Sequence, residues 1–255
     1  MAPDGQRRPH QRGIEEARRD WTVLGRTDPL WAVLVHPGTK DGGWALDEFL
    51  ATGRADVAAS REWLAELGLP TTWERALDFG CGVGRLSQAL AGHAREVVGV
   101  DISAPMLDVA RRIDQTDGAA TFVHNDANDL AVFPDGHFDL IYCVLVLQHL
   151  PRQAIDGYLF EFLRVLRPGG TVVVQLPTRA LWTAKGVIWR LVPFPLIRLA
   201  QRHLLRYPAP MRMTRVSDVD FTRTVSRLGG VVAGRMVDPS YTEDFVNIRY
   251  ALRHR

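Results

Sequence analysis

RALDFGCGVGRLS, residues 75–87, is the stretch that decides the fold. An apolar run with one acid, Asp78, ends in glycines at alternate positions, Gly80, Gly82 and Gly84, and a helical pattern follows. This order predicts a strand, a tight turn and a helix. Glycine suits the turn because it adopts backbone angles closed to other residues and, lacking a Cβ, lets a ligand lie against the backbone. We therefore expect a flat, polar ligand to dock on this turn.

A second strand, predicted over residues 97–100, ends in another acid, Asp101. A carboxylate at the end of that strand can accept hydrogen bonds from both hydroxyls of a ribose, so the two strands predict a cofactor that contains adenosine. In a dinucleotide fingerprint, G-x-G-x-x-G, the third glycine would fall where this chain has Arg85. The sequence therefore does not encode the close packing that a pyrophosphate needs.

Four features in a fixed order resemble the class I S-adenosylmethionine-dependent methyltransferases, whose first signature is the short form G-x-G-x-G. They are residues 78–84 (DFGCGVG), Asp101, the pair Asn125-Asp126, and residues 138–150 (FDLIYCVLVLQHL). The resemblance implies S-adenosylmethionine as the methyl donor and a doubly wound α/β fold. That fold is a seven-stranded, mainly parallel sheet whose last strand is antiparallel, with an N-terminal helical cap and a helical insertion after the fifth strand.

The resemblance also implies which residues bind the cofactor. Asp126 would accept a hydrogen bond from the adenine amino group, and a cation near the glycine turn, for which Arg54 is the candidate, would neutralise the cofactor carboxylate. The acidic cluster around Asp126 suits loop capping better than a hard cation, so we predict no metal site. The expected cofactor contacts are Asp78, Gly80, Cys81, Gly82, Gly84, Asp101, Ile102, Met106, Asn125, Asp126, Ala127, Cys143, Leu147 and Arg54.

The composition is that of a globular protein with one substantial core. Its 255 residues are 46% hydrophobic and 24% charged, and we expect one methyltransferase domain over residues 71–255. Two cysteines are too few for a disulfide scaffold, and no apolar run is long enough for a signal sequence or a membrane span, so we expect a cytoplasmic protein. The net charge of +2 does not by itself favour nucleic-acid binding.

The N-terminal 70 residues form two segments of different composition. Residues 1–19 are polar and contain five arginines, which predicts a disordered extension. Residues 20–70 are rich in aromatic and aliphatic side chains and predict a helical cap, with a short helix over 41–53 that stops at Gly53 and a second helix over 56–67. In the resembled family such helices close over cofactor and substrate.

An insertion over residues 178–215 separates this chain from a minimal member of the resembled family. Residues 162–217 contain ten basic residues and no acid, and an amphipathic basic helix is predicted over 196–207. Three interpretations compete: a pocket wall for an anionic substrate, a face that contacts a membrane or an amphiphilic substrate, and an oligomer edge. We favour a substrate-shaping lid, with a dimer contact next, so the chain is expected as a monomer or homodimer. The predicted acceptor contacts are Trp44, Phe49, Tyr142, Gln148, Trp182 and Arg212.

The predicted activity is methyl transfer to a small molecule of secondary-metabolite or lipid-like type, with oxygen preferred over nitrogen and carbon as acceptor. His149 follows the fourth strand and is the best general-base candidate, although a structural histidine fits the sequence equally well. Nucleic acid is disfavoured as substrate, because the signature of nucleic-acid amine methylation does not follow strand four. A nicotinamide oxidoreductase and a non-catalytic cofactor-binding partner are the alternative classes.

Overall fold

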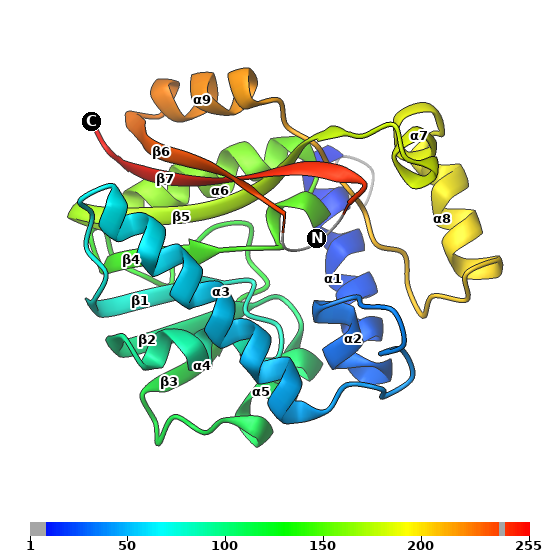
Figure 1. Ribbon diagram of the computed structural model, residues 1–255, viewed down its shortest axis with the longest axis horizontal. Helices are drawn as coiled ribbons and strands as arrows, with labels where there is room; N and C mark the ends of the chain where they lie inside the picture. Colours follow the sequence, from blue (N-terminus) through cyan, green and yellow to red (C-terminus); the bar gives the residue numbers. More distant parts are fainter. Residues whose placement is uncertain (1–8, 240–242) are drawn as a thin grey trace, which may run out of the picture.

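A seven-stranded sheet forms the centre of the protein in the computed structural model, which describes residues 9–239 and 243–255. Strands β1 to β5 run parallel, and β7 is antiparallel to both of its neighbours, β5 and β6 (Figure 1). The order is β3-β2-β1-β4-β5-β7-β6, which confirms the predicted doubly wound sheet. The strands are β1 Trp73–Phe79, β2 Ala94–Asp101, β3 Ala120–His124, β4 Phe138–Cys143, β5 Leu166–Ala180, β6 Gly230–Asp238 and β7 Phe245–His254.

Helices cover both faces of the sheet because successive buried side chains of each central strand point to opposite sides. On β4, Leu140 packs with α3 and α4, whereas Ile141 packs with α6 and α9. The longer helices are α1 Pro9–Thr27, α3 Leu46–Glu66, α5 Ala104–Ile113, α6 Arg152–Val165, α8 Phe194–His203 and α9 Asp218–Arg227; the shorter ones are α2 Pro29–Val33, α4 Arg85–Ala91 and α7 Ala184–Leu191, with a 3-10 turn, η1, at Leu147–His149.

The predicted disordered extension over residues 1–19 is wrong from Pro9 onward, where α1 begins; residues 1–8 lie outside the described residues. Ile14 and Ala17 are buried at a spacing of one helical turn, and Trp21 and Leu24 continue the same stripe. Two small or aliphatic residues among many polar ones were too weak a pattern to predict a helix. Their burial against the rest of the protein stabilises it.

The expected break at Gly53 is also absent, since α3 runs without interruption from Leu46 to Glu66. Gly53 is buried in the middle of this helix, where a Cβ would lie 2.5 Å from the carbonyl oxygen of Arg85. The glycine therefore allows α3 to cross closely over the start of α4 instead of ending a helix. This helix, expected as part of the cap, belongs to the layer that covers the sheet.

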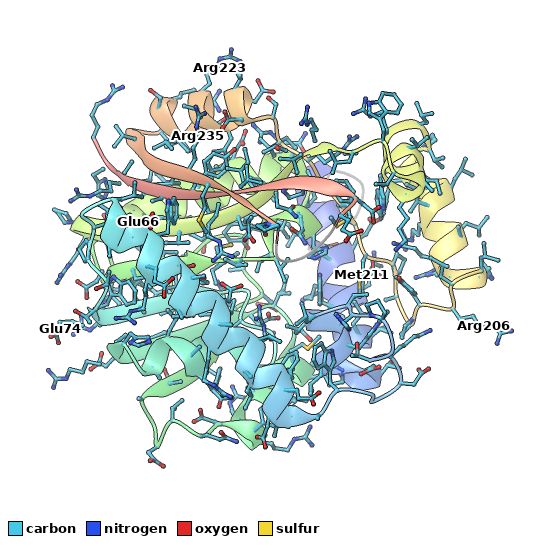
Figure 2. All side chains as sticks on the ribbon, in the orientation of Figure 1. Glu66, Glu74, Arg206, Met211, Arg223 and Arg235 are labelled. Atoms are coloured by element: carbon cyan, nitrogen blue, oxygen red, sulfur yellow. The ribbon has the colours of Figure 1, made fainter. Side chains whose placement is uncertain are left out.

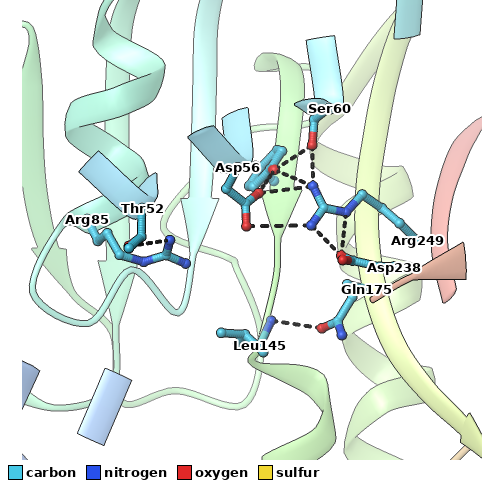
Figure 3. Close-up of polar contacts among 9 residues, drawn as sticks. Thr52, Asp56, Ser60, Arg85, Leu145, Gln175, Asp238 and Arg249 are labelled. Carbon is cyan, nitrogen blue, oxygen red and sulfur yellow. Dashed lines mark hydrogen bonds and ion pairs between the residues drawn. The ribbon is translucent and has the colours of Figure 1, made fainter. Parts of the chain in front are cut away.

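A fully buried cluster of charges connects α3 to β7 and β6, the last two strands at one edge of the sheet (Figure 3). The guanidinium of Arg249 on β7 pairs with Asp56 of α3 at 2.9 Å and with Asp238 of β6, and the three side chains are only 2–3% exposed. Tyr142 of β4 donates to Asp56 at 2.5 Å and lies 2.7 Å from the hydroxyl of Ser60. Both carboxylates therefore have a cationic partner in a region from which water is excluded.

Four helices gather at the end of the sheet where the parallel strands terminate: α1 and α2 lie beside that edge, and α7 and α8 project beyond it (Figure 1). The last two form the insertion after β5, with helices at Ala184–Leu191 and Phe194–His203 in place of the single helix predicted over 196–207. Among the described residues, no helix combines the length and the apolar character needed to cross a membrane.

Candidate active site

The glycine turn follows β1 and has the left-handed backbone that the sequence predicts. Gly80 and Gly82 have φ angles of 73° and 54°, which side chains with a Cβ rarely adopt. Asp101, at the end of β2, fixes the turn by accepting hydrogen bonds from the amide of Gly82 at 2.9 Å and from that of Ser103 at 2.8 Å. Burial raises the pKa of Asp101, and these amide donors oppose the rise.

Asp78 lies beneath the turn instead of in the site. It is 1% exposed and accepts a hydrogen bond of 2.6 Å from the hydroxyl of Ser87, the third residue of α4. Burial raises the pKa of this carboxyl to about 7, with the Ser87 bond acting in the opposite direction. Its contact with Ser87 connects the end of β1 to the first turn of α4, so its role is to support the turn.

A cavity that we call the cofactor cavity opens above the turn. Its floor is the turn and the end of β2, and its roof comes from α1 and from Val33 at the end of α2. A Cβ on Gly82 would lie 2.7 Å from Val33, so the glycine is needed for this roof to close. Of the predicted cofactor residues, Gly80, Cys81, Gly82, Asp101, Ile102 and Asn125 line it.

The other predicted cofactor residues do not line this cavity. Arg54 is exposed on α3, whereas Arg85, at the start of α4, is 2% exposed and lines the cavity in its place. Asp126 is exposed and forms an ion pair of 3.1 Å with Arg18 of α1. Those remaining are Asp78 beneath the turn, Gly84 and Met106 against neighbouring helices and strands, Ala127 on the surface, and Cys143 and Leu147 in the core.

The residues present fit an adenosine-containing methyl donor. Asp101 places a carboxylate beside the turn, where it can accept hydrogen bonds from ribose hydroxyls. Val100 and Ile102 give apolar surface on either side of it. Gly80 and Gly82 leave the backbone open at the same point.

A second, larger cavity of about 640 Å³ adjoins the first, and we call it the acceptor cavity. Val33, Leu145 and His149 line both cavities, so the two meet at these side chains. The remaining wall is mostly apolar and comes from α2, from α7 and α8, and from the segment after α8, including Trp189, Leu196, Tyr207 and Met211. Such a wall suits an elongated, largely apolar molecule.

His149 stands at the junction with a defined proton arrangement. Its Nδ1 is 2.7 Å from the backbone carbonyl of Arg212, which can only accept, so Nδ1 carries the hydrogen and donates. The ring also packs edge-on against Trp21 of α1, with centroids 5.1 Å apart. Burial lowers the pKa of His149 to about 4, with the bond to Arg212 opposing it. The neutral ring therefore presents an unprotonated Nε2 at pH 7.

The basic face of the insertion is directed at α1 and not into the acceptor cavity. Arg198 and Arg212 lie 3.8 Å from Glu16, and Arg202 lies 3.9 Å from Asp20. Since α1 forms part of the roof of the cofactor cavity, these pairs join the two cavity walls. These three arginines therefore do not line the acceptor cavity, whereas Lys185 of α7 does.

Most of the predicted acceptor contacts lie outside the acceptor cavity. Tyr142 is buried in the cluster around Arg249, Trp182 is 76% exposed with its ring under the guanidinium of Arg190, and Phe49 is fully buried with Trp44 against it. Gln148 does line the cavity, whereas Arg212 reaches the site only through its carbonyl. Aromatic character in the sequence did not separate core residues from site residues.

Sequence reasoning missed several residues at the site. Trp21 and Val33 come from the N-terminal helices, and Asn247 comes from β7, about 100 positions after His149. Leu145 has a φ angle of 65°, rare for a residue with a side chain, and its amide donates to Gln175 at 3.2 Å (Figure 3). No local pattern marks these positions; only the approach of distant segments brings them together.

Comparison with known proteins identifies the segment that contains the glycine turn. Residues 77–174 match the family model described as a methyltransferase domain. A 2-methyl-6-phytyl-1,4-hydroquinone methyltransferase from Synechocystis sp. is 33% identical over 164 residues, which are 63% of this chain and 50% of that protein. A demethylmenaquinone methyltransferase from Clavibacter sepedonicus is 42% identical over 107 residues, 41% of this chain and 42% of that protein. The chain thus spans half or less of these curated relatives.

The fold extends well beyond the matched segment. The crystal structure of magnesium protoporphyrin IX methyltransferase from Synechocystis with bound S-adenosylhomocysteine superposes with a TM-score of 0.64 at 21% identity, over 94% of this chain and 99% of that one. The same architecture therefore includes the helices before and after the matched segment. With its glycine turn, its strand-end acid and its match to the methyltransferase domain model, the segment over residues 77–174 is identified as a class I S-adenosylmethionine-dependent methyltransferase domain.

Proposed function

We propose that the protein transfers a methyl group from S-adenosylmethionine to a hydroxyl oxygen of an elongated, mostly apolar small molecule. The observation that carries this proposal is the position of His149, which lines both cavities and directs an unprotonated Nε2 to their junction. A donor in one cavity and an acceptor in the other would meet beside a proton acceptor. Holding two reactants aligned in this way contributes about 7–11 kcal/mol to lowering a barrier.

The bound cofactor supplies an electrophilic methyl group on a positively charged sulfur. In the proposed step the acceptor oxygen forms a bond to that methyl carbon as the sulfur–carbon bond breaks, and the hydroxyl proton passes to Nε2 of His149. With a pKa of about 4, His149 is a weak base, so it takes the proton only as the new bond makes the hydroxyl acidic. Val33 and Leu145 exclude water from the junction.

The acceptor class is proposed from the wall of the acceptor cavity and from the names of the relatives. The wall is apolar over most of its length, with Trp189, Leu196 and Met211 among its residues. The matched relatives are named for a phytyl hydroquinone, for demethylmenaquinone and for ubiquinone biosynthesis. We therefore propose a ring hydroxyl on a molecule with a long hydrocarbon tail, with nitrogen as the alternative nucleophile.

Calorimetric titration tests the cofactor and a methylation assay tests the reaction. S-adenosylhomocysteine should bind, and NAD should not, which separates this proposal from a nicotinamide oxidoreductase. Protein with S-adenosylmethionine should then release S-adenosylhomocysteine only when a tailed phenol is added. Binding of the cofactor product without turnover on any tailed phenol or amine would indicate a non-catalytic binding protein instead.

We also propose that the insertion contacts a membrane surface from the cytoplasm. Leu191, Leu196, Leu199 and Leu204 are 57–79% exposed, and Figure 2 shows Arg206 at the outer edge of the same segment. Exposed leucines next to a cation such as Arg206 favour an anionic lipid surface. Co-sedimentation with phosphatidylglycerol vesicles, but not with phosphatidylcholine vesicles, is expected. Dimerisation through this face, measured by analytical ultracentrifugation, would be the contrary result.

A further inference from the structure

The segment that leaves α8 returns past α1 toward the sheet, and four of its residues, 211–214, run beside η1 (Figure 1). We call these four residues the strap. The amide of Thr214 donates to the carbonyl of Gln148 at 2.6 Å, and its hydroxyl donates to the carbonyl of Leu150, also at 2.6 Å. Thr214 therefore holds the residue on each side of His149.

The strap holds the ring of His149 as well. Nδ1 donates to the carbonyl of Arg212 at 2.7 Å, and this bond selects the neutral tautomer that has its hydrogen on Nδ1. Without such a bond, either nitrogen of a neutral imidazole can carry the hydrogen. The unprotonated Nε2 at the junction therefore depends on where the strap places the carbonyl of Arg212.

The same four residues form part of the wall of the acceptor cavity. Met211 and Met213 line that cavity, whereas Arg212 and Thr214 make the contacts with η1. The two sets alternate along the strap. An acceptor that packs against the two methionines would therefore lie against the segment that orients His149.

The strap is anchored at both ends. Gln201 of α8 is 6% exposed, and its Nε2 donates to the carbonyl of Met211 at 3.1 Å while its Oε1 accepts from the amide of Met211 at 3.0 Å. Beyond the strap, the amide of Val216 donates to the carbonyl of Pro177 of β5 at 3.1 Å. These anchors fix the path of the strap, and Thr214 connects the strap to η1 between them.

Thr178 of β5 shows the ordinary use of a threonine hydroxyl in this protein. Its Oγ1 donates to the carbonyl of Val246 at 3.0 Å, between two strands that a ladder of backbone pairs already joins. The strap and η1 belong to no strand of the sheet. The placement of His149 therefore depends on individual hydrogen bonds, of which the Thr214 hydroxyl supplies one.

We infer that the strap positions His149 and that Thr214 is a positioning residue for it, because its hydroxyl keeps η1 where the carbonyl of Arg212 can fix the ring. The inference rests on the proposed function for the role of His149 as the base. Thr214 is not among the residues that line either cavity, so it acts through His149 and not on the reactants.

The first test reads the tautomer of His149 by ¹⁵N–¹H NMR of histidine-labelled protein saturated with S-adenosylhomocysteine, so that it does not depend on turnover. His149→Phe assigns the signal among the 8 histidines. The unaltered protein should show one form, with the hydrogen on Nδ1, at pH 7. Thr214→Val keeps the branched shape and loses the hydroxyl, so a second form with the hydrogen on Nε2 should appear. Thr214→Ser should restore the single form.

The second test is kinetic, with para-dodecylphenol as the acceptor. In Thr214→Val, kcat should fall about 10-fold, because part of the contribution of a general base, about 10²–10⁴-fold, is lost when the base is misplaced. The KM for S-adenosylmethionine and the dissociation constant of S-adenosylhomocysteine should stay within about twofold, because the cofactor cavity is not altered. Thr214→Ser should recover most of the lost kcat.

Thr178→Val is the matched control, since it also removes one hydrogen bond from a partly buried threonine hydroxyl to a backbone carbonyl. Each valine variant should lower the melting temperature by about 2–4 °C. Only Thr214→Val should change the tautomer of His149. The same mixture of forms in Thr178→Val would show a general loosening of the protein and would overturn the inference.

A second variant keeps the inference testable if Thr214→Val does not fold. Gln201→Met frees Met211, which is next to Arg212, and should also produce the second form of the His149 ring. Hydrogen on Nε2 in the unaltered protein, or hydrogen on Nδ1 alone in every variant, would refute the positioning role. A mixture in Thr214→Val with an unchanged kcat would support that role and refute His149 as the base.

Discussion

Replacing His149 with phenylalanine should make the stability of the protein less sensitive to acid. Burial lowers the pKa of His149 from 6.5 to about 4. Between these values the unfolded chain binds a proton at this position that the folded protein does not, so stability present above pH 6.5 is lost as the pH falls toward 4. Phenylalanine keeps a flat ring against Trp21 and cannot take up a proton.

The size of the effect follows from the shift. With these two pKa values, His149 should cost the folded state about 1.4 kcal/mol at pH 5.5 and about 2.5 kcal/mol at pH 4.5, relative to pH 8. The difference in unfolding free energy between His149→Phe and the unaltered protein should therefore move in favour of the variant by these amounts. All other titrating groups are common to the two proteins and cancel in the difference.

Urea unfolding followed by tryptophan fluorescence at pH 4.5, 5.5, 6.5 and 8 measures this difference. The difference in unfolding free energy between the two proteins would stay constant across the series, within about 0.5 kcal/mol, if His149 titrated normally. That result would show that burial does not keep the ring neutral at the junction. A kinetic consequence follows as well. In the unaltered protein, kcat/KM should not fall as the pH is lowered from 7 to 5, because His149 remains unprotonated over that range.

Three further variants test the turn. Gly82→Val places a branched side chain at a φ of 54° and a Cβ 2.7 Å from Val33, so S-adenosylhomocysteine binding should disappear in calorimetry; retained affinity would contradict the cofactor site. Asp101→Asn should weaken the same binding about 10- to 100-fold by removing charge-assisted hydrogen bonds, and an unchanged dissociation constant would argue against the ribose contact. Asp78→Asn should raise the unfolding free energy at pH 8 by up to about 4 kcal/mol, since stability from a carboxyl with a pKa of about 7 is lost as pH rises and Ser87 can still donate to an amide oxygen; a less stable variant at pH 8 would refute this.

The glycine turn and Asp101 were predictable because their residues are close in sequence. The glycine turn and Asp101 lie within about 20 positions of one another, and each follows a strand of the same sheet edge. A glycine-rich turn after one strand and an acid at the end of the next form a local sequence pattern that few other structures produce. The doubly wound sheet could be predicted for the same reason, since the apolar strands alternate with helices along the chain.

The acceptor half was not predictable, because its residues are brought together by packing. Asn247 joins Gln148 only because β7 inserts between β5 and β6, and Val33 reaches the turn only because α2 folds over it. Tryptophan and tyrosine misled the sequence analysis because large aromatic side chains fill cores as often as they line sites. Tyr142 was expected at the acceptor and instead serves a buried charge cluster.

That charge cluster also constrains how the chain can acquire its structure during synthesis. Asp56 is 193 positions from Arg249, so their ion pair cannot form until the ribosome has moved past residue 249. Burying a carboxylate is costly until its hydrogen-bonded cation is in place, so α3 should not dock finally on the sheet before β7 has entered it. Val33, which precedes α3 in the chain, lines both cavities, and Asn247 of β7 lines the acceptor cavity. The cofactor site, whose signature is complete by Asp101, should therefore become competent only when the last strand is in place.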